Sequence, residues 1–288
     1  MFSGALCWRV PTVPARRVLG GATITASTAA RIFNDARPVA IIQQLCTEFE
    51  PEQFALCYPP GIENHYWTAA RNRIVEHELQ AAGLEQPCIL EIGCGKGVVV
   101  AFFRKKGCPC WGVELAQVTP IESVKDFVHT GVSATELPSA QRESFKILFL
   151  LDVIEHLPDP GAFLSTLKAA FPNVSRLIIT VPARTELWSN YDTFYGHYRR
   201  YDLDSLRAVV NGIGGTVLSL RYFFRILYLP ARLTLALFHR RSVRINAPRN
   251  GMKLVHYLIS RICFADLFLL PPGVRGTSII CTVQLRSK

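Results

Sequence analysis

Several features that would assign a class of protein at once are missing from this sequence. None of its 9 cysteines form a C-x-x-C pair, and Cys108-Pro109-Cys110 does not have metal-site spacing. Its longest uncharged stretch is well short of the roughly 18 residues that a membrane-spanning helix needs. Long runs of Ser, Gly or Gln and internal repeats are absent as well. These absences predict a globular protein of a reducing compartment, with no structural metal and no membrane span.

Acidic residues are missing from one long stretch. Between Ser205 and Ala265 the chain has 10 basic residues and no acid, which equals the net charge of +10 of the whole sequence. Such a surface favours an anionic partner: membrane lipid, a phosphorylated or carboxylated substrate, or, less well supported, nucleic acid. A basic surface that faces only water is the alternative.

The beginning of the sequence also lacks acids, because the first one is Asp35. Residues 1–38 are therefore predicted to be an irregular arm, followed by a folded domain over 39–288. Arg, Ser, Thr and Ala in this arm are typical of a mitochondrial transit peptide, but a disordered arm or a misplaced start codon fits equally. The main expectation for location is cytoplasmic, with peripheral membrane association open.

The most informative stretch runs from Cys88 to Glu114. An apolar strand over 88–92 precedes three glycines at alternate positions, Gly93, Gly95 and Gly97, and a helix over 98–106 follows them. A second strand, 111–114, ends in Glu114, 21 residues after Gly93, the spacing at which an acid reaches a ribose hydroxyl. A strand, a glycine turn and a helix form the first half of a nucleotide-binding βαβ unit.

The order of glycines and acids separates two ligand classes. The spacing is G-x-G-x-G, whereas the dinucleotide pattern is G-x-G-x-x-G, and Glu91 stands two residues before the first glycine. That carboxylate would repel a pyrophosphate but not a cationic ligand. The pattern Glu91-x-Gly93-x-Gly95-x-Gly97 followed by Glu114 resembles the class I S-adenosylmethionine-dependent methyltransferases. A turn without a ligand and an NAD site are the alternatives.

The remaining chain continues the alternation of strands and helices. Further strands are predicted over 127–130, 145–151, 177–182, 216–220 and 277–285, and helices over 39–48, 63–82, 160–171 and 203–210, with a loop over 51–61. The resemblance implies an α/β, Rossmann-like seven-stranded sheet, mostly parallel with an antiparallel last strand and sandwiched by helices. Residues 221–275 form a basic and apolar helical insertion, in which Arg221, Arg225 and Arg232 are expected near one helical face and Pro230 is expected to kink the helix. A membrane-interface helix, a lid over the substrate and simple packing on the sheet are all open for it.

A second motif follows the fourth strand. The string Asp152-x-x-Glu155-His156-Leu157-x-Asp159 resembles the fourth motif of the same family, and in an open α/β sheet these polar residues reach the ligand edge. The cofactor implied by the resemblance is S-adenosylmethionine. Its site is expected to contain Glu91, Gly93, Cys94, Gly95, Gly97, Glu114, Leu115, Ser133, Ala134, Asp152 and Val153. The family commonly has an acid near position 133, so Ser133 is a departure.

The segment 183–201 is rich in aromatic, His and Arg residues, a composition that fits a substrate site better than a core. Its pattern resembles the UbiE/Coq-like, type 11/12 branch of the family. The substrate candidates are Trp188, Asp192, Tyr195, Arg199, Arg200 and Tyr201. The two arginines could clamp a carboxylate or phosphate of the acceptor, or they could pair with Asp192 or Asp202 and only fix the loop. His156 and His197 are the candidate catalytic bases, with a capping or core role as the alternative for His156.

The predicted function is transfer of a methyl group to an oxygen, nitrogen or carbon of a small-molecule or lipid-like acceptor, with possible membrane contact through the insertion. A non-catalytic scaffold or sensor with the cofactor fold is the alternative, and an NAD-dependent oxidoreductase is disfavoured. Methylation of nucleic-acid amino groups is also disfavoured, because no N/D-P-P-Y/F string follows the fourth strand. Carbon or ribose methylation of RNA is left open.

Overall fold

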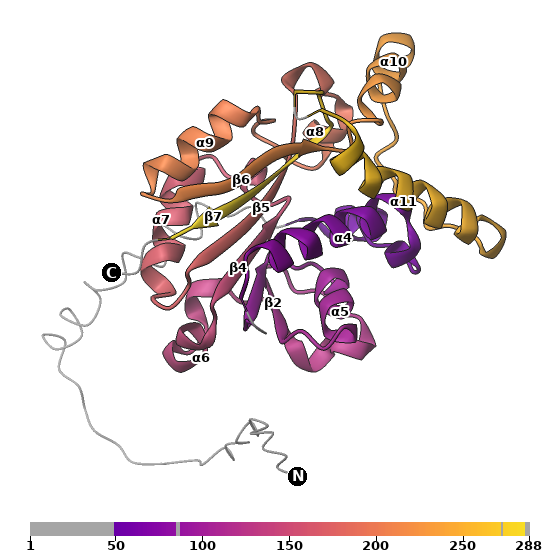
Figure 1. Cartoon of the computed structure of the whole chain (residues 1–288). Coiled ribbons are helices and arrows are strands. Elements are labelled where there is room, and N and C mark those ends of the chain that lie inside the picture. The colour runs from indigo at the N-terminus through magenta and orange to yellow at the C-terminus, as the bar shows by residue number, and fades with distance from the viewer. Residues whose placement is uncertain (1–48, 85–86, 272, 286–288) are drawn as a thin grey trace, which may run out of the picture. The chain divides into compact units, whose positions relative to one another are not determined.

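Seven strands form one mixed sheet in the order β3-β2-β1-β4-β5-β7-β6 (Figure 1). The computed structural model describes residues 49–84, 87–271 and 273–285, all of which fall in one unit that spans Ile42–Lys288. The predicted arm over 1–38 and the weak helix over 39–48 lie outside the described residues. The strands are β1 (Ile89–Ile92), β2 (Cys110–Glu114), β3 (Val128–Thr130), β4 (Ile147–Leu151), β5 (Arg176–Pro182), β6 (Thr216–Phe223) and β7 (Ser278–Gln284).

The pairing of the strands matches the fold predicted from the sequence. β3, β2, β1, β4 and β5 are paired in parallel, whereas β7 runs antiparallel between β5 and β6. Every residue of β1 and of β4 is buried, as expected for strands covered by helices on both faces. The carboxyl ends of the parallel strands therefore meet at one edge, which is where open α/β sheets bind ligands.

Helices cover both faces of this sheet (Figure 1). The α-helices are α3 (Pro51–Cys57), α4 (Tyr66–Ala81), α5 (Val98–Lys105), α6 (Ser139–Ser144), α7 (Pro160–Ala170), α8 (Asn190–Phe194), α9 (Leu203–Gly212), α10 (Tyr228–Phe238) and α11 (Lys253–Leu269). Short 3₁₀ turns are η1 (Ile62–Asn64), η2 (Glu122–Phe127), η3 (Ala134–Glu136), η4 (Ile154–His156), η5 (Thr185–Leu187) and η6 (Asn250–Met252). One apolar core lies between the sheet and α7 and α9, and the other lies between the sheet and α4, α5 and α11.

Local sequence signals explain where several helices begin. Asp159 accepts a hydrogen bond from the backbone N–H of Ala162 (2.9 Å), and Pro160 occupies the first turn of α7. Asp202 caps α9 in the same way by accepting from the N–H of Ser205 (2.8 Å). Both caps agree with the predicted starts of these helices, at Pro160 for α7 and Leu203 for α9.

The prediction of a loop over 51–61 was wrong for its first half, which forms α3. Pro51 stands at the start of this helix, where its missing N–H costs nothing. Gln53 Oε1 accepts a hydrogen bond from the N–H of Glu50 (2.7 Å) and completes a capping box. The proline thus begins a helix here and does not mark a loop.

The prediction of one helical face for Arg221, Arg225 and Arg232 was also wrong. Arg221 lies in β6, which pairs with β7 as far as Phe223, and Arg225 lies in the turn after it. Only Arg232 is in α10, which begins at Tyr228. Pro230 falls in the first turn of α10, where proline is tolerated, and therefore causes no kink.

Candidate functional site

The glycine loop between β1 and α5 forms one wall of the site. Gly93, Gly95 and Gly97 all have positive φ angles (71°, 55° and 81°), which glycine adopts without a steric penalty. A Cβ atom on Gly95 would lie 2.5 Å from the hydroxyl of Tyr58, so this ring rests directly on the loop. The glycines thus permit both the turn and the close approach of another segment.

Glu114 connects the end of β2 to this loop. Its Oε2 accepts a hydrogen bond from the N–H of Gly95 (2.8 Å), and its Oε1 accepts from the N–H of Ala116 (3.1 Å). The side chain is nearly buried, and it lines a cavity of about 790 Å³ at the carboxyl edge of the sheet. Each carboxylate oxygen has two lone pairs, so Glu114 can hold the loop and still accept from a ligand hydroxyl.

The other predicted cofactor residues divide into two groups. Gly93, Leu115, Ser133, Ala134, Asp152 and Val153 line the cavity together with Glu114. Glu91, Cys94, Gly95 and Gly97 do not line it. Glu91 is buried in β1, where burial in the first place and the nearby charge of Glu114 raise its pKa to about 8, although Arg71 opposes them.

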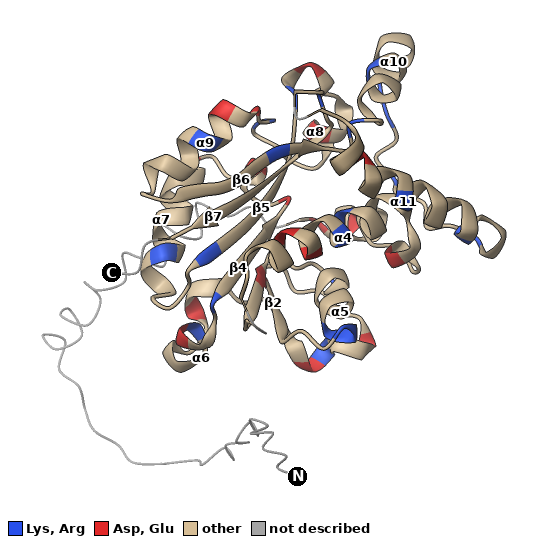
Figure 2. Ribbon diagram, in the orientation of Figure 1, with Lys and Arg blue, Asp and Glu red and all other residues tan. Residues whose placement is uncertain are grey.

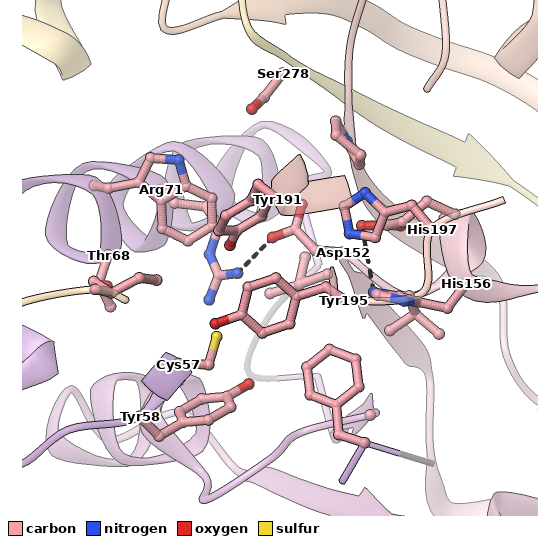
Figure 3. A pocket seen from close by; sticks show the side chains of 18 of the residues that line it. Cys57, Tyr58, Thr68, Arg71, Asp152, His156, Tyr191, Tyr195, His197 and Ser278 are labelled. Atoms are coloured by element: carbon pink, nitrogen blue, oxygen red, sulfur yellow. Dashed lines mark hydrogen bonds and ion pairs between the residues drawn. The ribbon is translucent and has the colours of Figure 1, made fainter. Parts of the chain in front are cut away.

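Asp152 and Arg71 form an ion pair inside the cavity. The Arg71 guanidinium donates to Oδ2 of Asp152 at 2.7 Å (Figure 3). Asp152 has a φ of 59°, an uncommon value for a residue other than glycine, and its N–H donates to the carbonyl of Thr180. The pair presents a positive and a negative group side by side at the carboxyl end of β4. Arg71 was not predicted as a site residue, although it lies in the helix predicted over 63–82.

His156 and His197 lie against each other at another part of the same cavity (Figure 3). Their ring centroids are 4.6 Å apart, with an interplanar angle of 82°. Burial, followed by the neighbouring His197, lowers the pKa of His156 to about 3, so this imidazole is neutral at physiological pH. The structure therefore brings together the two predicted catalytic candidates, which are far apart in the sequence.

Asp192 holds His197 in place. Nδ1 of His197 donates to Oδ1 of Asp192 (2.8 Å), and Arg200 donates to both carboxylate oxygens (2.8 and 3.0 Å). Asp192 is fully buried, and burial alone would raise its pKa, but the hydrogen bonds from His197 and Arg200 keep it at about 2. Asp192 is thus ionised and fixes the imidazole from behind.

Arg200 lines the cavity, and its guanidinium is bound to Asp192 and to the carbonyl of Ala183. The structure thus contains the pairing with Asp192 that the sequence left open for this arginine. Arg199 donates to the carbonyls of Leu157 and Pro158 and does not line the cavity. Both arginines hold the loop, and their assignment to the substrate stays a prediction.

The remaining substrate candidates also separate. Tyr195 lines the cavity, and its hydroxyl donates to the carbonyl of Val243 (2.7 Å). Trp188 is 41% exposed and lies outside the cavity lining, as does Asp192. Tyr201 is buried and donates to the carbonyl of Ile154 (3.2 Å), so its role is structural. Composition identified the right segment but could not tell inward from outward side chains.

Cavity-lining residues that the sequence did not predict come from α4, α8 and α11 and from the end of α3. They include Cys57, Tyr58, Thr68, Tyr191 and His256 (Figure 3 labels all but the last). Tyr58 follows α3, in a segment that was expected to be a loop. Its contact with Gly95 depends on residues 37 positions away, for which the sequence contains no local signal.

A glycine loop, an acid at the end of β2 and a cavity at the carboxyl edge of a doubly wound sheet define an α/β protein that binds a nucleoside-containing ligand. The sequence model of the methyltransferase-domain family matches residues 64–220, more than half of the chain. The chain therefore belongs to this family, within the class I S-adenosylmethionine-dependent methyltransferases.

Curated relatives share the same region at low identity. The ubiquinone biosynthesis O-methyltransferase of Pseudomonas fluorescens is 26% identical over 99 residues, which cover 32% of this chain and 41% of the relative. The enzyme of the same name from Hahella chejuensis is 24% identical over 110 residues, which cover 35% of this chain and 46% of the relative. The chain thus spans less than half of the length of these relatives.

Solved structures include two similar methyltransferases. A Burkholderia thailandensis 1,6-didemethyltoxoflavin-N1-methyltransferase has 15% identity and a TM-score of 0.45, covering 93% of this chain and 92% of its own. A coclaurine N-methyltransferase bound to N-methylheliamine and S-adenosylhomocysteine has 10% identity and a TM-score of 0.49, covering 92% and 90%.

Proposed function

We propose that this protein is an S-adenosylmethionine-dependent methyltransferase that acts on a small-molecule or lipid-like acceptor. The observation that carries the proposal is Glu114, an ionisable carboxylate that both anchors the glycine loop and lines the cavity. A carboxylate at the end of the second strand can accept hydrogen bonds from both ribose hydroxyls. Family membership supports the same cofactor.

The charges at the carboxyl end of β4 fit the amino-acid end of this cofactor. Arg71 can donate to its carboxylate, and Asp152 can accept from its ammonium group, so that the ion pair now joining them would be exchanged for two pairs with the ligand. The bound cofactor supplies a methyl group activated by its sulfonium. The protein has to exclude water and hold the acceptor in line at about 3–3.5 Å from that methyl carbon.

The histidines are placed where they can serve the acceptor. His156 is neutral, and Asp192 fixes His197 in a single orientation. Both imidazoles can contact an acceptor hydroxyl or amine, and their role as catalytic bases stays a prediction. We assign this half of the cavity to the acceptor and the half near Glu114 to the cofactor.

Calorimetric titration with S-adenosylhomocysteine tests the proposal. The wild-type protein should bind it with micromolar affinity, and Glu114→Ala should weaken binding at least tenfold. Glu122→Ala is the matched control, because Glu122 is exposed and pairs only with Lys125. Absence of binding by a folded wild-type protein would refute the proposed cofactor.

We further propose that α10 and α11 contact an anionic membrane surface. Large apolar side chains are exposed on both helices: Leu229, Leu233, Leu237 and Phe238 on α10, and Leu254, Val255, Tyr257, Leu258, Ile262, Phe268 and Leu269 on α11. Basic residues lie on α10, on α11 and on the segment between them (Figure 2). Among the described residues no helix is both long and apolar enough to cross a membrane. An interfacial position suits helices with exposed apolar and basic groups.

The position of α10 supports an acceptor that arrives from this surface. Pro230, Ala231, Thr234 and Leu235 line the cavity, whereas Leu233 and Leu237 are exposed on the same helix. An amphiphile at the membrane surface would therefore meet the cavity wall directly. The cytoplasmic location expected from the sequence stays a prediction.

Cosedimentation with lipid vesicles tests the membrane contact. The protein should bind vesicles that contain phosphatidylglycerol more strongly than pure phosphatidylcholine, because each basic residue near an anionic surface contributes about 1 kcal/mol. The double variant Leu233→Gln/Leu237→Gln should bind at least tenfold more weakly. Leu218→Gln, an exposed leucine in β6, is the control. Equal binding by both variants would contradict the assignment of this surface.

A further inference from the structure

Three potential metal ligands converge in the acceptor half of the cavity. Glu155 and His156 come from η4, and His197 comes from the segment after α8. Each offers one ligand atom, and these atoms all lie within 4.8 Å of one another. Ligand bonds of about 2.0–2.2 Å place three ligands of one ion about 3–3.8 Å apart, so the widest pair has to close by up to about 1–2 Å when the ion binds.

The hydrogen bonds of His197 leave the correct nitrogen available. Ionised Asp192 can only accept, so Nδ1 of His197 is bound to Asp192 and Nε2 is the nitrogen left for a ligand. Asp192 is itself fixed by Arg200 and by the N–H of Ser189 (2.9 Å). A buried carboxylate that orients an imidazole in this way is the usual support behind a histidine ligand.

The carboxyl of Glu155 is buried beside the two imidazoles. One carboxylate oxygen is buried without a hydrogen bond, and the other is 4.0 Å from Nε2 of His156, beyond hydrogen-bonding distance. A buried carboxyl beside two imidazoles is costly unless a cation or a proton neutralises it.

We infer that Glu155, His156 and His197 bind one divalent transition-metal ion. Two imidazoles and one carboxylate favour Mn²⁺, Fe²⁺, Co²⁺ or Zn²⁺ over Ca²⁺ or Mg²⁺. The three ligands leave coordination positions open toward the cavity, where an oxygen or nitrogen of the acceptor can bind. That role in positioning the acceptor rests on the proposed methyl transfer, whereas metal binding itself does not.

The sequence predicted no metal site because two of the ligands are adjacent and the third is 41 residues away. This spacing does not match any known metal-binding sequence motif. The site exists only because the loop after β5 folds back over η4, and the N–H of Tyr198 donates to the carbonyl of Glu155 (2.8 Å). Asp152, which precedes these ligands in the same segment, is directed to Arg71 instead.

The test is titration of the chelator-treated full chain with Mn²⁺, followed by calorimetry. Wild-type protein should bind one Mn²⁺ ion, and Glu155→Gln and His197→Gln should each weaken binding at least tenfold. Asp192→Asn, which reaches the site through His197, should weaken it by about 10- to 100-fold if the ring loses its orientation. His256→Gln is the matched control, because His256 lines the same cavity but pairs with His65. Its affinity for Mn²⁺ should equal that of the wild type.

A second measurement needs no variant and therefore does not depend on how the variants fold. Electron spin echo modulation of the wild-type Mn²⁺ complex should show two directly coordinated imidazole nitrogens. Absence of saturable binding, absence of nitrogen coupling, or binding unchanged in folded Glu155→Gln and His197→Gln would each overturn the inference. None of these results would bear on S-adenosylhomocysteine binding, so the two proposals can fail separately.

Discussion

Replacing Gly95 by alanine tests how the segment after α3 closes the glycine loop. The new Cβ would be held at a φ of 55° and would lie 2.5 Å from Cζ and Oη of Tyr58. A left-handed backbone at a residue with a side chain costs about 1–2 kcal/mol. Forcing a ring out of a packed position adds about 1–3 kcal/mol. The free energy of unfolding should therefore fall by about 2–5 kcal/mol.

Gly83→Ala is the matched control. Its φ is 66°, close to that of Gly95, but a Cβ there meets no atom within 4 Å. The free energy of unfolding of this variant should fall only by the cost of the left-handed backbone, about 1–2 kcal/mol. Guanidinium unfolding curves of both variants, and of each combined with Tyr58→Ala, measure the difference.

In the Tyr58→Ala background, Gly95→Ala should cost no more than Gly83→Ala, because the obstructing ring is gone. A coupling energy of about 1–3 kcal/mol between positions 58 and 95 is expected from the overlap. If Gly95→Ala costs the same with and without Tyr58, the ring does not rest on the loop.

Three further predictions concern stability. Because the folded-state pKa of Glu91 is raised to about 8, its contribution to stability is full below about pH 4.5 and is lost as the pH rises through 8. The free energy of unfolding of the wild type should therefore fall by up to about 1.4 kcal/mol per pH unit between pH 5 and 8, and Glu91→Gln should remove this slope. A slope that is unchanged in Glu91→Gln would contradict the raised pKa. Arg200→Met should cost about 3–5 kcal/mol in urea unfolding, since it leaves the buried carboxylate of Asp192 short of a partner, and a loss below 1 kcal/mol would show that the pair is dispensable. Phe103→Ala should lower the same free energy by about 3–5 kcal/mol, because the ring is fully buried between α5 and the sheet.

The sequence predicted the elements whose signals are local. Apolar runs located the strands to within a few residues, as in β4, predicted over 145–151 and observed over 147–151. Asp159 and Asp202 located two helix starts, because a cap and its helix are neighbours in the sequence. Glu114 could be predicted for a related reason, since the length of one βα unit fixes its distance from the loop.

The sequence could not predict side-chain contacts between residues that are far apart along the chain. The pairing of Arg71 with Asp152 joins α4 to the end of β4, and neither residue marks the other. The roles of Arg199 and Arg200 depended on which carbonyls and carboxylates the folded loop would present to them. α3 was missed for another reason, because a proline that begins a helix and one that interrupts it look alike without the cap beside it.

The position of β7 has a consequence for how the protein is made. β7 is the last of the seven strands to be synthesised, yet it lies between β5 and β6 and pairs with both. Until β7 leaves the ribosome, β6 has no strand to pair with. The edge of β5 is also still unpaired at that stage, although α10 and α11 have already been synthesised. Unpaired strand edges are prone to bind other chains. The nascent protein therefore depends on its last strand to close the sheet, and a short truncation there would release two strands at once.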